Sequence, residues 1–335
     1  MSEIKRSRKS TGQVTLTEVA KLAGVSTITV SRVLNTPEVV TEETRLAVHK
    51  AIDKTGYVPN LLAGGLASTK SRLIAAVVPT ISGPVFLETI QSLTESLASA
   101  GYQLMIGQTG YDEVREEDLI SAIIGRRPDG IFLTGVMHSA KSRKRLKASG
   151  IPVVEAWDLS NEPIDRVIGF SHVAVGKKVA EFIKSKGKKN IGIITGTDTR
   201  AQIRRDSFCK ALDNKVTVVN VPPPTTIEAG REGLRQLLKS GNKVDAIFCS
   251  SDMLALGVLI EAQSKGIKIP SELGVIGFAD LSSSKELEPA LSSVRIDGML
   301  IGRLAAEYFT TGDIDSKGPN KVIDLGFTII DRASI

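Results

Sequence analysis

From Leu73 onward, short apolar runs rich in β-branched residues alternate with helical stretches. The first runs are LIAAVVP, YQLMIGQT, GIFLTG and PVVEAW, and after RVIGF the rhythm restarts with NIGIITG, VTVVNV, AIFCSS and LGVIGF. Unbroken apolar strands separated by helices are typical of a parallel sheet covered on both faces. The pattern therefore predicts an α/β body made of two doubly wound lobes, joined near residues 168–170 and 297–300.

The charge of the chain is concentrated before this body. Residues 1–72 contain eleven basic and six acidic residues, a net charge of +5, whereas the other 263 residues contain 32 basic and 31 acidic residues. Such asymmetry indicates a small module that meets a polyanion, attached to a nearly neutral body. By itself the excess charge is equally compatible with a solvated surface.

Composition excludes several classes of protein. The 335 residues include 24% charged and 41% hydrophobic residues, which is unlike a disordered or fibrous chain, and no apolar run reaches the roughly 18 residues of a membrane span. The basic N-terminus lacks the apolar core of a secretory signal. Cys209 and Cys249 are far apart and outside any metal-binding spacing. We expect a soluble cytoplasmic protein with reduced thiols, no metal and no cofactor.

Residues 15–35 have the pattern of a helix-turn-helix. Thr15 and Glu18 have the spacing of a capping box, so a helix should begin near Leu16 and end at Gly24. Ser26 can cap a second helix with Val30 and Val33 on its inner side. Its other face carries Thr27, Ile28, Ser31 and Arg32. A third helix is expected after Thr41, with Ala47, Val48, Ala51 and Ile52 buried, and an end at Gly56.

These residues resemble the DNA-binding head of the LacI/GalR family of bacterial transcription regulators. The likeness covers LTEVAKLAGVSTITVSRVLN and VTEETRLAVHKAIDKTGYVPN. It implies that the second helix enters the major groove, with Thr27, Ile28 and Arg32 near base edges and Thr29 and Ser31 near phosphates. Arginine can make a bidentate contact with guanine, whereas isoleucine can contact only a thymine methyl.

The resemblance also implies a hinge over residues 59–72 that pairs with a second copy in the minor groove. Leu66 matches the leucine that wedges between base pairs, and Asn60 and Ala63 are the other expected DNA contacts. Gly64 and Gly65 stand where many members have arginine and a helix former. Two glycines cost about 2 kcal/mol of helix propensity relative to alanine, and a plain flexible linker is the alternative interpretation.

The body resembles the sugar-binding fold of periplasmic binding proteins, which forms the effector domain of this family. The expected boundaries are a head at 14–58 and a body at 73–335, with an N-lobe of about 73–168 and 300–335 and a C-lobe of about 169–299. GPVF, GIPVVEAWD and the closing strand IDLGFT are most similar to the gluconate-utilisation repressors. The fold class is thus a small all-α head plus two doubly wound α/β lobes of the periplasmic-binding-protein type.

The effector is expected at the carboxyl ends of the strands, in the cleft between the lobes. By position, Arg204 matches the cation that family members present to the effector. Ala279 replaces an acidic residue of many sugar-sensing members, which favours an anionic ligand. The full set of expected effector contacts is Arg204, Ser171, Asp252, Glu155, Asp158, His138 and Phe86. Arg204 could instead be a surface residue, Asp252 could cap a helix, and a lone histidine such as His138 is often structural.

These features together predict a sequence-specific DNA-binding regulator and not an enzyme. The expected role is repression of sugar-acid utilisation genes by a homodimer on a pseudo-palindromic operator, relieved by the effector. A regulator of a neutral-sugar or nucleoside pathway remains an alternative. A helix-turn-helix fused to a sugar-acid kinase or isomerase would need a phosphate-binding glycine loop, and this sequence contains none. An exported sugar-binding protein would need a secretory signal, which this sequence also lacks.

Overall fold

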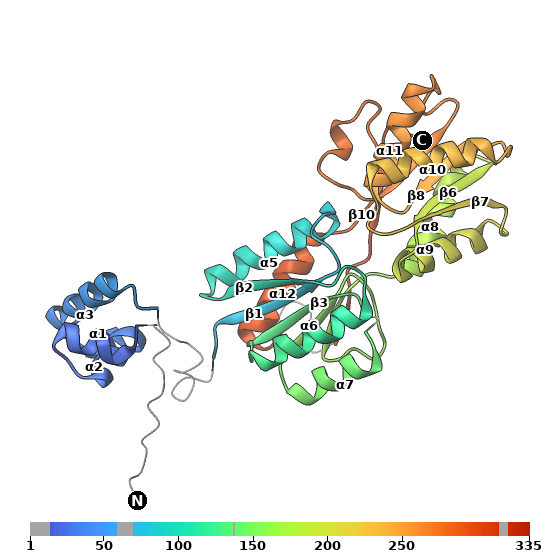
Figure 1. The fold of residues 1–335 in the computed structure, drawn as a ribbon. Helices are drawn as coiled ribbons and strands as arrows, with labels where there is room; N and C mark the ends of the chain where they lie inside the picture. The colour runs from blue at the N-terminus through green and yellow to red at the C-terminus, as the bar shows by residue number, and fades with distance from the viewer. Residues whose placement is uncertain (1–13, 59–69, 137, 315–320) are drawn as a thin grey trace, which may run out of the picture. The chain divides into compact units, whose positions relative to one another are not determined.

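The computed structural model describes residues 14–58, 70–136, 138–314 and 321–335. The chain divides into two compact units, Met1–Ser71 and Arg72–Ile335 (Figure 1). The first contains the helices α1 (Leu16–Ala23), α2 (Thr27–Asn35) and α3 (Glu42–Thr55), with a short 3-10 turn η1 (Pro37–Val39) before α3. The three helices of the sequence prediction are confirmed.

Local sequence sets the ends of the head helices. The Thr15 side chain accepts a hydrogen bond from the Glu18 backbone N–H, and the Glu18 carboxylate accepts one from the Thr15 backbone N–H at 2.6 Å. Gly24 ends α1 with φ +69°, a left-handed conformation that glycine adopts without strain. Val19, Val30 and Val48, one from each helix, are fully or almost fully buried, and they hold the three helices together.

The body begins with an N-lobe sheet of six parallel strands in the order β11-β5-β4-β3-β1-β2. Its strands are β1 (Leu73–Val78), β2 (Gln103–Gln108), β3 (Gly130–Thr134), β4 (Val153–Ala156), β5 (Arg166–Gly169) and β11 (Val322–Asp324). Alternate side chains face opposite layers, so Ile74 packs with one core and Ala75 with another. The helices α5 (Leu87–Ser99) and α12 (Gly298–Thr311) cover one face, and α6 (Glu113–Gly125) and α7 (Ala140–Ser149) the other (Figure 1).

The C-lobe repeats this arrangement, with the sheet order β12-β10-β9-β8-β6-β7. Its strands are β6 (Ile191–Gly196), β7 (Val216–Val221), β8 (Ala246–Cys249), β9 (Gly274–Ala279), β10 (Ser292–Arg295) and β12 (Thr328–Ile330). The helices α8 (His172–Ser185) and α9 (Thr199–Ala211) pack on one face, and α10 (Ile227–Lys239) and α11 (Asp252–Ser264) on the other. Two short 3-10 turns, η2 (Pro84–Phe86) and η3 (Ser284–Glu286), complete the body.

The prediction for the last residues of the chain was wrong in one respect. The segment IDLGFT was expected to form one closing strand, and 300–335 to belong to the N-lobe. The structure divides the segment IDLGFT between two strands. β11 pairs in parallel with β5 of the N-lobe, whereas β12 pairs antiparallel with β10 of the C-lobe. Residues 325–327 therefore make a third crossing between the lobes, in addition to those after β5 and β10.

A buried ion pair joins α10 to α11 and provides a test of the fold. The Glu261 carboxylate accepts hydrogen bonds from Arg231 at 3.0 Å and from Arg235 at 2.8 and 2.9 Å, and its side chain is only 4% exposed. The Arg235 hydrogen bond is the main cause that lowers the pKa of Glu261 to about 2. Because this pKa is depressed on folding, the carboxylate stabilises the fold fully above about pH 4.5 and loses that effect as the pH falls towards 2.

We therefore expect Glu261→Gln to lower the melting temperature at pH 7, and the difference from the wild type to shrink between pH 4.5 and 2. Thermal unfolding followed by circular dichroism at several pH values measures this. Glu286→Gln, at an exposed position beside Lys285, is the matched control and should change little. A difference that persists at pH 2 would show that the ion pair is not its source.

Candidate operator and effector sites

The outer face of α2 presents the residues expected to contact DNA. Thr27, Ile28 and Arg32 are exposed, and the Ile28 side chain is 64% exposed although it is apolar. Ser26 caps the helix by accepting a hydrogen bond from the Thr29 backbone N–H at 3.1 Å. An exposed apolar residue between polar ones, on a short helix whose other face is buried, is suited to a partner surface that is partly apolar.

Two further residues of this face are partly buried. The Thr29 hydroxyl lies 2.9 Å from the Ser26 hydroxyl, and the Ser31 hydroxyl accepts a hydrogen bond from the Asn35 amide at 3.2 Å. Each hydroxyl keeps further hydrogen-bonding capacity for a phosphate oxygen. The hinge residues Asn60, Ala63 and Leu66, with Gly64 and Gly65, lie outside the described residues.

The body contains two adjoining cavities at the carboxyl ends of the parallel strands, where the lobes face each other. The inner cavity has a volume of about 70 Å³, and the outer one of about 630 Å³. Tyr111, Asp198, Arg200 and Pro223 line both cavities, so these four residues lie where the two cavities adjoin. The expectation that a pocket would lie at these strand ends thus agrees with the geometry.

Arg204 lines the inner cavity and is 6% exposed. Its Nη1 lies 3.0 Å from Nδ1 of His172, its Nη2 donates to the Ser250 carbonyl at 3.3 Å, and its guanidinium lies 4.1 Å from the centre of the Phe278 ring. Its Nε is buried and has no hydrogen-bond partner among the residues that the structure describes. Burial lowers the pKa of Arg204 to about 10, so the side chain remains charged at neutral pH.

Phe86, another expected contact, also lines the inner cavity. Its ring meets the indole of Trp157 edge-on, with centroids 5.1 Å apart, and the Arg200 guanidinium lies 5.3 Å from the Phe86 centroid. Because Phe86 comes from the N-lobe and Arg200 from α9 of the C-lobe, this cation–π contact bridges the two lobes.

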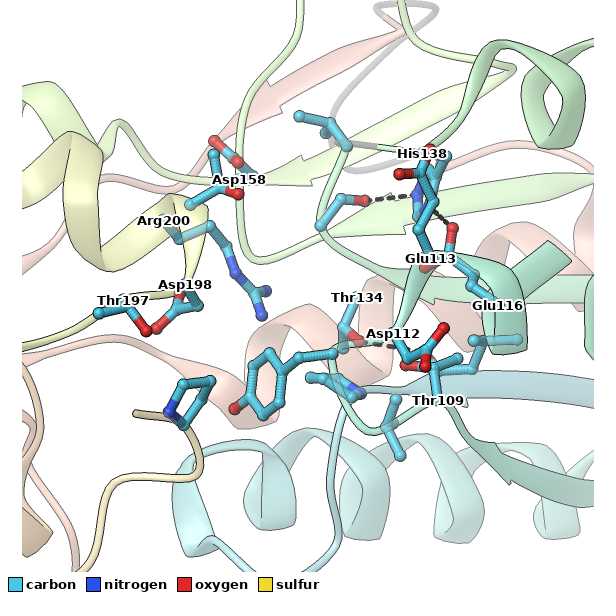
Figure 2. A pocket seen from close by; sticks show the side chains of 18 residues that line it. Thr109, Asp112, Glu113, Glu116, Thr134, His138, Asp158, Thr197, Asp198 and Arg200 are labelled. Carbon is cyan, nitrogen blue, oxygen red and sulfur yellow. Dashed lines mark hydrogen bonds and ion pairs between the residues drawn. The ribbon is translucent and has the colours of Figure 1, made fainter. Parts of the chain in front are cut away.

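The outer cavity brings Asp158 and His138 together with side chains that the sequence did not single out (Figure 2). Asp158 is buried. Within the described part of the chain, its Oδ2 has no hydrogen-bond partner, and neither has Nη1 of Arg200. Burial raises the pKa of Asp158, against the opposing effects of the Leu159 N–H and the two arginines. The cavity therefore offers one buried donor and one buried acceptor to a polar ligand.

His138 lies at the other side of the outer cavity (Figure 2). Its Nδ1 is 2.7 Å from a Glu116 carboxylate oxygen and its Nε2 is 3.0 Å from the Gly135 carbonyl. Both ring nitrogens therefore have protein partners, and the ring can contact a ligand only by its edge or face. Asp112, Glu113 and Glu116 make this side of the cavity acidic.

Three of the expected effector contacts lie outside both cavities, and we do not retain them. Ser171 caps α8 by accepting from the Ala174 N–H at 3.1 Å. Asp252 is buried and accepts from Ser284, Ser293 and the Leu281 N–H. Glu155 is buried, paired with Arg143 at 2.9 Å and bonded to the Ile164 N–H. For Asp252 and Glu155, the chain's own donors already occupy the oxygen atoms that a ligand would need. Ala279 is likewise not among the residues that line either cavity.

Arg200, His172, Tyr111 and Asp198 are among the lining residues that the sequence analysis missed. One signal was available for Arg200, because it lies four residues before Arg204 on the same helix and so on the same face. Asp198 caps this helix by accepting from the Ala201 N–H at 3.1 Å. Tyr111 follows a strand in a left-handed conformation with φ +63°, and burial raises its pKa.

A helical head with a polar outer face, and a separate two-lobed body with a cavity between the lobes, define a DNA-binding transcriptional regulator that senses a small molecule. Residues 15–60 match the family model described as bacterial regulatory proteins, lacI family, and 180–335 match a periplasmic binding protein-like domain. The chain is 35% identical over 335 residues to the HTH-type transcriptional regulator GntR of Pseudomonas aeruginosa, with 98% of each covered. It therefore belongs to the LacI family.

Solved structures agree with this assignment. A LacI family regulator from Silicibacter pomeroyi superposes with a TM-score of 0.88 at 32% identity, covering 96% of this chain and 99% of that one. The lac repressor, in a structure described as a dimer bound to operator and an anti-inducer, shares the fold with a TM-score of 0.78 at 21% identity, covering 96% and 99%. Among the helices of the described residues, none has the length and apolar character needed to cross a membrane.

Proposed function

We propose that this protein is a cytoplasmic repressor of sugar-acid utilisation genes, released from its operator by a sugar acid of the gluconate type. The observation that carries this proposal is the pair of arginines in the cavity. Nε of Arg204 and Nη1 of Arg200 are both buried, and neither has a hydrogen-bond partner in the described ranges. A carboxylate satisfies such donors better than a neutral hydroxyl does, because charge-assisted bonds are about twice as strong.

The remainder of the cavity suits a polyhydroxylated chain. Oδ2 of Asp158 can accept from a hydroxyl, and the acidic side chains Asp112, Glu113 and Glu116 offer further acceptors. An acid whose carboxylate lies between the arginines would extend its hydroxyls towards this acidic side. We propose Arg204, Arg200, Asp158, Phe86 and His138 as effector contacts, and no catalytic step at this site.

On the operator we propose a homodimer that places α2 of each head in the major groove. Arg32, Thr27 and Ile28 would contact base edges, and Thr29 and Ser31 would contact phosphates. Asn60, Ala63 and Leu66 are the proposed hinge contacts. Effector binding would favour a closer approach of the lobes, and operator binding would weaken to the extent that the effector prefers that arrangement.

Calorimetry with different ligand classes tests the effector. We expect D-gluconate or 2-keto-D-gluconate to bind about 10- to 100-fold more tightly than glucose or ribose, since a hydrogen bond to a charged group contributes about 1.5 to 3 kcal/mol. Uridine represents the nucleoside alternative. If glucose, ribose or uridine binds more tightly than both acids, the sugar-acid assignment is wrong.

The influence of the effector on operator binding by the protein is measured separately. Adding the acid that binds should dissociate the protein from its operator in a gel-shift assay, and incubation should return the acid unchanged. Operator affinity that rises with the ligand would identify a co-repressor instead, and chemical conversion of the acid would identify an enzyme.

A further inference from the structure

His172 is the first residue of α8 and is 3% exposed. Its Nδ1 lies 3.0 Å from Nη1 of Arg204, and its Nε2 lies 3.0 Å from the backbone carbonyl of Trp157. A guanidinium can only donate a hydrogen bond, and a carbonyl can only accept one. Nδ1 must therefore be the acceptor and Nε2 must carry the proton, which defines a neutral imidazole of one tautomer.

The packing around His172 keeps the ring in this state. Gly176, one turn further along α8, lets that helix approach α9 closely, since a Cβ there would be 2.3 Å from the Arg204 carbonyl oxygen. Phe170 meets the imidazole edge-on at 4.7 Å between centroids. Burial, reinforced by Arg204 and Arg200, holds the pKa of His172 well below 6.5. The ring thus remains an acceptor for Arg204 at neutral pH.

Trp157 continues the chain of contacts into the N-lobe. Its backbone has φ +66°, a left-handed conformation that is strained for tryptophan, and its indole N–H donates to the Thr89 hydroxyl at 3.0 Å. Thr89 belongs to α5, and its carbonyl oxygen lies so close to α12 that a Cβ at Gly302 would be 2.4 Å away. Trp157 is therefore hydrogen-bonded to a residue that lies in the close contact between α5 and α12.

On the basis of the effector site proposed above, we propose that His172 is a positioning residue that couples the effector to the N-lobe. It holds the Arg204 guanidinium through Nδ1, and it passes any displacement of that group through Nε2 to Trp157 and on to Thr89. Arg204 and His172 belong to the C-lobe, whereas Trp157 and Thr89 belong to the N-lobe. The N-lobe directly follows the head and hinge in the sequence, so it is the lobe through which a signal must pass to the DNA.

Trp157 is the only tryptophan of the chain, so fluorescence excited at the red edge of indole absorption reports on it alone. We expect Arg204→Met to shift the emission of Trp157 in the wild-type background, and this shift to disappear in the His172→Leu background. Arg204→Lys, which keeps the charge, provides the same comparison if the methionine variant unfolds. An equal shift in both backgrounds would overturn the proposal.

Two conservative substitutions test separately the contact of His172 Nδ1 with Arg204 and that of Nε2 with the Trp157 carbonyl. Asparagine carries an acceptor near the place of Nδ1, and glutamine carries a donor near the place of Nε2. His172→Asn should therefore keep the gluconate affinity within about threefold of wild type but lose most of the operator release. His172→Gln should weaken gluconate binding about tenfold, with operator release retained once gluconate is saturating. Thr89→Val should resemble the asparagine variant.

Val173→Ala, at the exposed position next to His172 on α8, is the matched control and should leave affinity and release unchanged. If asparagine and glutamine give the same loss of both properties, His172 is only a packing residue and the proposal fails. The fluorescence measurement requires no effector. Failure of gluconate to bind the wild-type protein would therefore overturn the proposed function. The emission of Trp157 would still test the positioning role of His172.

Discussion

Arg32→Ala is expected to weaken operator binding by about 30-fold or more while the head stays folded. Arg32 lies on the exposed face of α2, and the core of the head is formed by other residues such as Val30 and Val33. A bidentate contact between arginine and guanine contributes about 1 to 3 kcal/mol, and a dimer makes it twice, so the loss is about 2 to 6 kcal/mol. A gel-shift titration at fixed salt measures this loss.

Lys50→Ala on α3 is the matched control, because it removes the same charge from an exposed position on another helix. Its affinity loss should be small. The dependence of affinity on salt distinguishes the kinds of contact, since loss of a phosphate contact lowers the slope by about 1 whereas loss of a base contact leaves it nearly unchanged. Wild-type affinity of the Arg32 variant would exclude Arg32 from base recognition.

Arg204→Met is expected to weaken sugar-acid binding about 10- to 100-fold. The substitution keeps most of the side-chain volume over Phe278 but removes the charge and the unpartnered Nε. One hydrogen bond from this Nε to the carboxylate, at about 1.5 to 3 kcal/mol, accounts for a loss of this size. The fold should survive, because an apolar side chain at a buried site avoids the desolvation of a charge.

Arg205→Met is the matched control for this measurement. Arg205 is the next residue on α9, but it points towards Asp206 and Asn220 and lines neither cavity. Calorimetry should find its affinity for gluconate close to that of the wild type. Equal affinity losses in the two variants would assign the effect to the general positive charge of α9 and not to the cavity.

The head was the part of the fold that the sequence predicted most fully. Thr15, Glu18 and Gly24 act within one or two turns of the backbone, so their residue types alone predict where α1 begins and ends. The apolar positions Val19, Val30 and Val48 predict which sides of the helices meet. A similar local argument identified most of the strands, because each buried strand is a continuous apolar run.

The end of the chain and part of the effector site could not be obtained in this way. Whether IDLGFT forms one strand or two depends on which sheet edges are available, and β5 and β10 supply those edges from distant parts of the sequence. Asp252 has the residue type of a ligand contact, yet Ser284 and Ser293, from segments 32 and 41 residues away, use its oxygen atoms. The residue type determines what a side chain can bind, but the tertiary structure determines which partner lies beside it.

The sequence by itself determined the helix-turn-helix head, the two-lobed α/β body and a cationic residue at Arg204. These features depend on local capping, on hydrophobic periodicity and on runs of residues long enough to be compared with a family. Only the tertiary structure decided that Arg200 lines both cavities, beside Asp158 in the outer one and Arg204 in the inner one, and that His172 joins Arg204 to the single tryptophan. Those contacts form between different elements, several of them from different lobes. Their geometry is fixed by the packing of helices and sheets, which no local pattern of residues specifies.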